Sequence, residues 1–176
     1  PGGYCEGLKI TGGSNVVFSP GVYVIKDGPL VVDGGASVNG TNVGFYFTGD
    51  DAGMKLAPAS SVSFTAPKDG VMTGILFFQD RTMRGEETYE ISSDNASVLL
   101  GTFYLPKGRL HAGGSQPVAQ NSAYTIIVAS RVTVSEGPVV VLNSNYSATD
   151  VPVPDGVGPL GRVAGSDRCF GSAEID

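Results

Sequence analysis

The chain has 176 residues, of which 41% are hydrophobic and 16% charged, a composition that suits one folded domain and excludes extensive disorder. The net charge of −6 makes nucleic acid an unsuitable partner, because phosphate binding requires basic patches. No run of about 18 apolar residues occurs, so we expect no membrane-spanning segment within this sequence.

The first seven residues, PGGYCEG, are expected to cap the N-terminal end of the fold. The chain begins with Pro rather than Met, which indicates a processed product or an excised domain. Any membrane anchor or export signal would then lie upstream.

From residue 8 onward, a pattern of three short apolar strands is repeated, with starts at residues 8, 30, 54, 89, 110 and 132. Four of the five spacings lie between 21 and 24 residues. The first strand alternates, as in Leu8 and Ile10, the second holds Val16 and Phe18, and the third is mostly apolar throughout. A long helical period is absent, so we expect little helix.

Glycine pairs follow the first strand of three repeats, where a corner requires φ > 0: Gly12-Gly13, Gly34-Gly35 and Gly113-Gly114. A sandwich of meandering strands would explain the strands and turns but not the recurring strand order. We therefore predict an all-β, single-domain β-solenoid (parallel β-helix) of about six coils, each of roughly 21–24 residues with three short strands.

The one long spacing, of 35 residues, contains an insertion, DRTMRGEET, at residues 80–88. Insertions in solenoids form loops on one face, often the binding face, although a variable loop without a partner is equally consistent. We also expect Asp80 and Arg81 to form a corner pair that orders this loop. The predicted partner-binding residues are Asp80, Arg81, Thr82, Met83, Arg84, Gly85 and Glu86.

The solenoid is predicted to span residues 1–143, with residues 144–176 as an irregular tail that caps it or packs along it. The two cysteines, Cys5 and Cys169, are either free thiols, intermolecular bridges or an intrachain disulfide. We predict the disulfide, which implies an oxidising compartment and stabilises the fold by at most about 5 kcal/mol in the chain-entropy model.

Several motifs resemble the C-terminal region of TadG-like proteins of bacterial Tad (Flp-type) pilus systems. They are SPGVYVI, GASVNGTNVGFYFTG and GILFFQDR, continued by GTFYLPKG and AYTIIVAS, so the resemblance covers roughly residues 5–143. It implies an envelope or surface protein, with an upstream pilin-like membrane segment and a role in pilus assembly or in the pilus itself. It offers no catalytic residues.

An enzyme acting on polysaccharide is the first alternative, because such enzymes often have solenoid folds and use paired carboxylates. Its candidate residues are Asp50, Asp51, Asp80, Arg81, Arg84, Glu86 and Glu87. His111 is the only histidine, and alternation with Leu110 predicts that it is exposed. No zinc, EF-hand or nucleophile-elbow motif is present. We therefore predict no catalytic residue, no metal ligand and no cofactor.

The sequence thus predicts a non-enzymatic structural, adhesive or assembly module, exported to the bacterial cell envelope or surface. Its partners would be pilus or envelope proteins, together with surface glycans. The alternatives are a polysaccharide-binding or polysaccharide-degrading β-helix and a polymer-forming solenoid similar to bactofilins.

Overall fold

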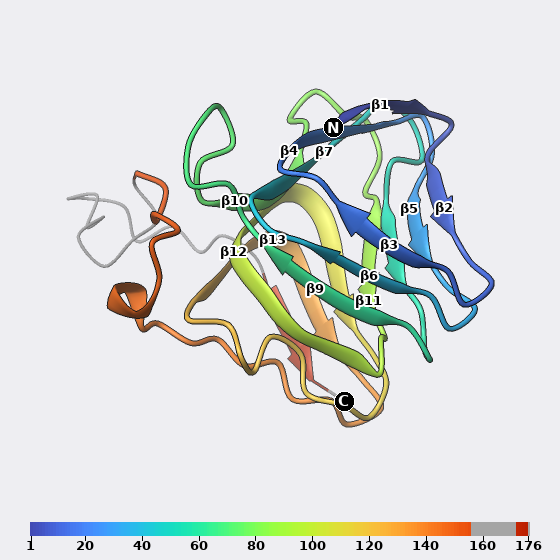
Figure 1. Ribbon diagram of the computed structural model, residues 1–176. Coiled ribbons are helices and arrows are strands. Elements are labelled where there is room, and N and C mark those ends of the chain that lie inside the picture. The colour runs from blue at the N-terminus through green and yellow to red at the C-terminus, as the bar shows by residue number, and fades with distance from the viewer. Residues whose placement is uncertain (156–171, 176) are drawn as a thin grey trace.

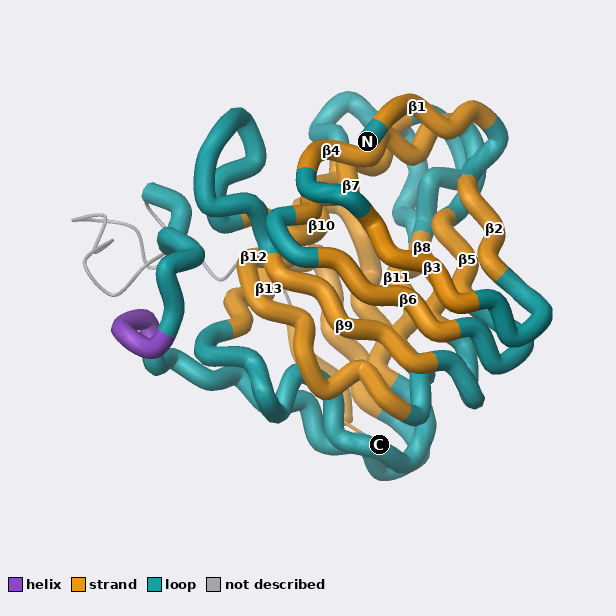
Figure 2. Tube along the Cα trace, in the orientation of Figure 1, coloured by secondary structure: helices purple, strands orange, loops and turns teal. Residues whose placement is uncertain are grey.

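Parallel strands wind around one axis and build three flat faces in a computed structural model that describes residues 1–155 and 172–175 (Figure 1). The predicted all-β solenoid of about six coils is confirmed. In the first four repeats the three strands lie on different faces, so each strand pairs with the equivalent strand of the adjacent coil (Figure 2).

Face 1 holds the third strand of each repeat. It comprises β1 (Gly2–Cys5), β4 (Gly21–Lys26), β7 (Val43–Thr48), β10 (Ile75–Gln79), residues 101–105 of β12 (Asn95–Ala112) and residues 125–129 of β13 (Thr125–Val134).

Face 2 holds the first strand of each repeat. It comprises β2 (Leu8–Ile10), β5 (Leu30–Val32), β8 (Met54–Leu56), β11 (Thr88–Ile91), residues 109–112 of β12, residues 131–134 of β13 and β14 (Ser172–Ile175).

Face 3 holds the second strand of each repeat. It comprises β3 (Asn15–Phe18), β6 (Ser37–Gly40), β9 (Ser61–Thr65) and residues 95–100 of β12, and it continues in a bridge between Val118 and Val140.

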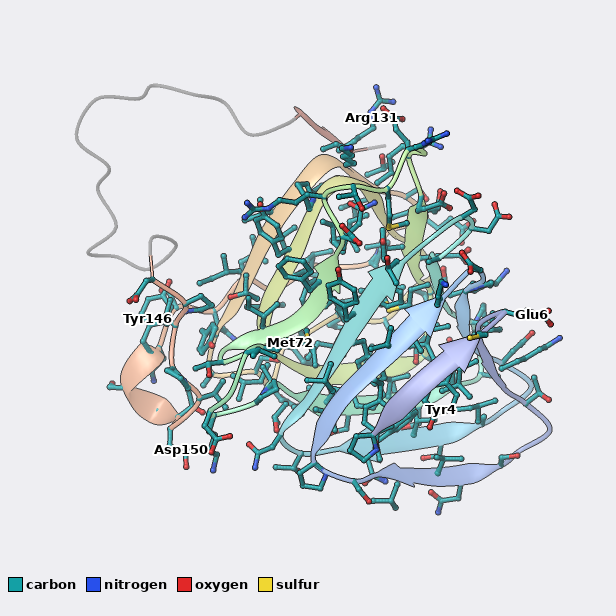
Figure 3. All side chains as sticks on the ribbon, turned by 90° about the horizontal axis from the view of Figure 1, so that it is seen from above. Tyr4, Glu6, Met72, Arg131, Tyr146 and Asp150 are labelled. Carbon is teal, nitrogen blue, oxygen red and sulfur yellow. The ribbon has the colours of Figure 1, made fainter. Side chains whose placement is uncertain are left out.

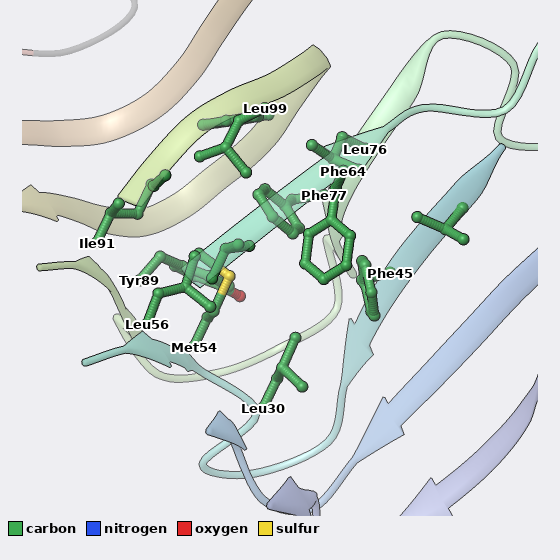
Figure 4. Close-up of a cluster of buried hydrophobic side chains, with 14 of the residues drawn as sticks. Leu30, Phe45, Met54, Leu56, Phe64, Leu76, Phe77, Tyr89, Ile91 and Leu99 are labelled. Carbon is green, nitrogen blue, oxygen red and sulfur yellow. The ribbon is translucent and has the colours of Figure 1, made fainter. Parts of the chain in front are cut away.

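The core lies inside the triangle of faces and consists of inward side chains from alternate strand positions (Figure 4). On face 1, parallel in-register pairing places Tyr23, Phe45, Phe77 and Phe103 in one column, with ring centroids 5.6, 5.8 and 4.9 Å apart. Each fully buried aromatic ring contributes about 1.5–3 kcal/mol, and each aromatic pair adds about 0.5–1.5 kcal/mol.

The predicted glycine corners are found between faces 2 and 3. Gly12 and Gly34 have φ of 70° and 62°, a backbone conformation that favours glycine. A Cβ on Gly34 would lie 2.9 Å from the Gly12 nitrogen, so adjacent corners can stack this closely only when residue 34 is glycine. Gly113 does not have positive φ. It is restricted instead by the Ser92 Oγ, which would lie 2.8 Å from its Cβ.

Both ends of the chain differ from the expectation. Residues 2–5 do not cap the fold but form β1, which pairs with β4 and adds a strand to face 1. The C-terminal tail is not wholly irregular, because β14 pairs with β13 at the opposite end of the stack. Tail residues 146–148 form the short 3₁₀ helix η1 (Tyr146–Ala148).

The third coil carries two insertions rather than the single one predicted. Residues 66–74 connect β9 to β10, whereas two residues make the same connection in each of the first two coils. Residues 80–87 connect β10 to β11. We call these segments loop A (residues 66–74) and loop B (residues 80–87). They lie at the two ends of β10.

Candidate functional site on the outer surface of face 1

A row of apolar side chains crosses the outer surface of face 1. Parallel pairing aligns one outward position on five strands, and these positions form what we call the outer ridge: Val24, Tyr46, Phe78, Tyr104 and Val128. All five side chains are partly exposed. Outward strand positions that face water are normally polar, so an apolar row at these positions is unusual.

The three aromatic rings of the outer ridge stack on one another. Tyr46 and Phe78 have centroids 5.5 Å apart and planes 13° apart, and the values for Phe78 and Tyr104 are 5.1 Å and 27°. Nearly parallel rings this close cover each other's faces. The ridge therefore exposes ring edges rather than ring faces.

Loop A covers one side of face 1. The Met72 side chain is buried against Gly44, where an added Cβ would lie 3.0 Å from the Met72 Cε. The tail supports the loop, because the Lys68 ammonium pairs with Asp150 and the Tyr124 hydroxyl donates a 2.7 Å hydrogen bond to the Pro152 carbonyl oxygen. Figure 3 shows Tyr146 and Asp150 in the tail on the same side as Met72.

Loop B begins at Asp80, whose carboxylate organises the turn. Its Oδ1 accepts hydrogen bonds from the Thr82 amide and hydroxyl, each 2.8 Å long, and its Oδ2 accepts one of 2.8 Å from the Thr48 hydroxyl. These hydrogen bonds lower the pKa of Asp80 to about 2; the bond from the Thr82 amide has the largest effect, and those from the two hydroxyls add to it. The pKa of Tyr46 is raised, mainly by burial and to a smaller extent by the neighbouring Asp80 carboxylate. Asp80 therefore places a fixed negative charge beside the ridge.

Arg81 lies against the outer ridge and not against Asp80. Its guanidinium carbon is 5.1 Å from the centroid of the Tyr104 ring, a cation–π contact. The ion pairs among the described residues do not include Asp80 with Arg81, so the predicted corner pair is wrong. The predicted ordering of loop B by Asp80 is nevertheless found, through hydrogen bonds to Thr82 and Thr48.

Loop B is anchored in the core. Met83 is 4% exposed and belongs to the hydrophobic cluster, so it is not available to a partner. The Lys107 ammonium donates a 2.8 Å hydrogen bond to the Met83 carbonyl oxygen, and the buried Gln79 Oε1 accepts one of 2.9 Å from the Lys107 amide. The loop is therefore fixed to the fold at Met83, and the alternative of a variable loop without a partner stays open. Its exposed residues are Arg81, Thr82, Arg84, Gly85 and Glu86.

Glu87 lies near two other candidate catalytic carboxylates, Asp50 and Asp51, at the corner between faces 1 and 2. The pKa of Glu87 is raised, mainly by burial and to a smaller extent by the negative charges of Asp51 and Asp50. Glu87 and Asp51 line a shallow depression on face 2, together with Lys55 and Glu90. Glu86 points to Arg109, with 3.7 Å between its Oε2 and the Nε, and Arg84 is exposed.

His111 projects outward from face 2, as the inward Leu110 requires, but it is partly buried rather than fully exposed. Its Nε2 lies 2.7 Å from the Ser135 Oγ. The neighbouring Glu90 instead accepts a hydrogen bond from the Ser92 hydroxyl and pairs with Lys55. A serine–histidine–carboxylate arrangement is therefore not assembled among these residues.

Of the two cysteines, Cys5 is exposed at the end of β1, whereas Cys169 lies outside the described residues, so the disulfide stays a prediction.

Within residues 1–155 and 172–175, no three His, Cys, Asp or Glu side chains group closely enough to hold a metal ion. The same part of the chain has no helix with the length and hydrophobicity needed to cross a membrane.

Fold and surface together define a parallel β-solenoid in which one outer face carries an apolar ridge between two loop insertions. No family model matches the chain, and no curated protein or solved structure does so either. The relation to TadG-like proteins rests on the sequence motifs and stays a prediction.

Proposed function

We propose that this chain is a non-enzymatic adhesive or assembly module of a Tad-type pilus or of the bacterial cell surface. It binds a protein of the pilus or envelope through the outer ridge and the exposed residues of loop B. The observation that carries this proposal is the stack of Tyr46, Phe78 and Tyr104 on an outward strand position, with Arg81 against Tyr104.

The composition of this surface favours a protein partner. Aromatic residues and arginine are enriched at protein–protein interfaces and supply most of the residues that dominate binding energy. The ridge is supported by paired strands below it, so little conformational entropy is lost when it is covered. Asp80 and Arg81 add charges of opposite sign beside the apolar centre, which would fix the orientation of the partner.

Export to the envelope or surface follows from the resemblance to TadG-like proteins. The predicted pairing of Cys5 with Cys169 would be independent support, but it cannot form in a molecule whose β14 pairs with β13, at the opposite end of the stack from Cys5. A disulfide requires an oxidising compartment such as the periplasm or the cell exterior. A rigid stack of coils also suits a structural module, because each coil is held on both sides by its neighbours.

Site-specific photo-crosslinking in the native cells tests this proposal. A photoreactive amino acid replaces Arg84, which is exposed in loop B, and the control carries the same group at Val17, which is 71% exposed on face 3. We expect a covalent adduct with a pilus or envelope protein at position 84 and none of that mass at position 17. An absent adduct, or one of equal yield at both positions, would overturn the proposal.

A polysaccharide-degrading enzyme is the runner-up, favoured by the raised pKa of Glu87 beside Asp51 in the depression on face 2. A carboxyl group that stays protonated at higher pH can act as a general acid. Release of reducing ends from a polyuronide by the native chain, abolished in Glu87→Gln, would replace the non-enzymatic proposal with this one.

A polymer-forming solenoid is favoured by one observation at the N-terminal end. Tyr4, Leu8, Val16 and Phe18 line an open apolar depression at the edge of β1, β2 and β3. Unpaired strand edges can pair with another chain. Filaments of the isolated chain in electron micrographs would support this alternative.

A further inference from the structure

Face 3 presents a second surface, which differs in chemistry from the outer ridge. Its strands β3, β6 and β9 lie side by side at the front of Figure 1, and residues 95–100 of β12 follow β9. The inward positions Val16, Val38 and Val62 fill the core, so the alternate positions point outward.

The outward positions form two rows with regular spacing. In-register pairing aligns the first row at strand spacing, about 4.8 Å. Its members are Asn15, Ser37, Ser61 and Asn95. The second row runs parallel to it, with two polar residues between two valines: Val17, Asn39, Ser63 and Val98.

None of these eight positions is charged, although the chain has 11 basic and 17 acidic residues. Charged side chains do occupy outward positions on the other faces, as Lys9, Lys55 and Glu90 do on face 2. A sheet face that only contacts water normally carries Lys and Glu, which also prevent association. The absence of charge across face 3 therefore points to a ligand that is itself uncharged.

The hydrogen-bonding groups of face 3 are largely free. Among the eight side chains of the two rows, the described residues show one mutual hydrogen bond, which lies within the first row and runs from the Asn95 Nδ2 to the Ser61 Oγ, at 2.9 Å. Amides and hydroxyls both donate and accept hydrogen bonds. Sugar hydroxyl groups need such partners, whereas carboxylate or phosphate ligands need Arg or Lys, which face 3 lacks.

From this we infer that face 3 binds a neutral polysaccharide. The chain of the ligand lies along the rows, its hydroxyl groups bond to the asparagine and serine side chains, and the valines contact its C–H groups. The two rows hold their side chains on paired strands, so the surface is ordered before binding. This inference does not depend on the proposed protein-binding function of face 1.

Binding assays with purified chain test it. The probes are insoluble cellulose, chitin, mannan and starch as neutral polymers, and polygalacturonate and hyaluronate as anionic ones. We expect retention on at least one neutral polymer and on neither anionic polymer. Failure to bind any of the neutral polymers, or equal binding to anionic ones, would overturn the inference.

Two variants show whether face 3 is the binding surface. Asn39→Asp with Ser63→Glu adds two negative charges to the second row, and Lys9→Glu makes the same change in net charge on face 2. We expect the double variant to reduce the bound fraction at least tenfold and Lys9→Glu to keep it within twofold of native.

Asn39→Ala with Ser61→Ala serves as a second face-3 variant, because it removes hydrogen-bonding groups without adding charge. It should also weaken binding, at an unchanged melting temperature. Native-like binding by both face-3 variants would overturn the inference.

Discussion

The Lys107 ammonium donates a 2.8 Å hydrogen bond to the carbonyl oxygen of Met83 and thereby holds loop B against the next coil. The same turn places the Met83 side chain in the core, where only 4% of its surface is exposed. The second insertion is therefore part of the folded core and also carries the exposed residues proposed to contact a partner.

Met83→Ala is expected to lower the free energy of unfolding by about 2–5 kcal/mol, because it leaves a cavity in the core. Arg84→Ala, one residue further along, is exposed and should change it by less than about 0.5 kcal/mol. Urea denaturation of both variants measures the difference. Equal stability of Met83→Ala and Arg84→Ala would show that loop B does not pack as described.

Asp80 gives the protein an acid-sensitive contribution to stability. Its pKa is about 2 in the folded chain, against 3.8 for a free aspartate, so folding favours the ionised form. This stabilisation is fully present above pH of about 4 and is lost as pH falls through about 2. Denaturant titrations between those values should show a smaller loss of stability in Asp80→Asn than in the native chain. Identical pH profiles would contradict the hydrogen bonds assigned to Asp80.

Gln79 satisfies a backbone group that leucine could not. Its Oε1 accepts the Lys107 amide hydrogen, while its Nε2 is buried without a partner. Gln79→Leu should lower stability by about 1–3 kcal/mol, because the Lys107 amide then loses its partner. Faster hydrogen exchange at the Lys107 amide, measured by NMR, is the specific signature. An unchanged exchange rate would show that another group accepts this hydrogen.

Two glycines on face 1 should differ in how much stability is lost on replacement by alanine. Gly101 has φ of 135°, and its Cβ would lie 2.6 Å from the Ala66 Cβ, so Gly101→Ala should lower stability by more than about 1 kcal/mol. At Gly44 the nearest atoms belong to the end of the flexible Met72 side chain, so Gly44→Ala should cost less. Thermal unfolding of the two variants compares them directly, and the reverse order would contradict the packing.

The predicted Cys5–Cys169 disulfide and the pairing of β14 exclude each other within one molecule. β1 and β14 lie at opposite ends of the stack, separated by six strand spacings, or about 29 Å. The three residue steps from Cys169 to Ser172 extend about 11 Å at most. Non-reducing mass analysis should therefore detect no Cys5–Cys169 crosslink if β14 pairs with β13. A crosslink would require β14 to leave that position and would support export.

The repeated three-strand pattern and the glycine corners made the solenoid predictable. The spacing of 22 residues between Leu8 and Leu30 places these residues on adjacent coils, where they pair in register. By contrast, loop A was missed because its length was assigned to one insertion after β10. The outer ridge could not be predicted, because adjacent aromatic residues in a continuous apolar strand, such as Tyr46-Phe47 and Phe77-Phe78, do not reveal which of the two points outward. Met83 shows the same limit, since an isolated methionine in a polar loop gives no sign of burial.

Binding between the purified chain and the protein crosslinked at position 84 tests the central claim most directly. Isothermal titration calorimetry would compare native protein with Tyr104→Ser on the outer ridge and Val17→Ser on face 3. The account predicts that Tyr104→Ser raises Kd at least tenfold and that Val17→Ser leaves it within twofold. Equal affinity of all three proteins would show that the outer ridge is not the contact surface.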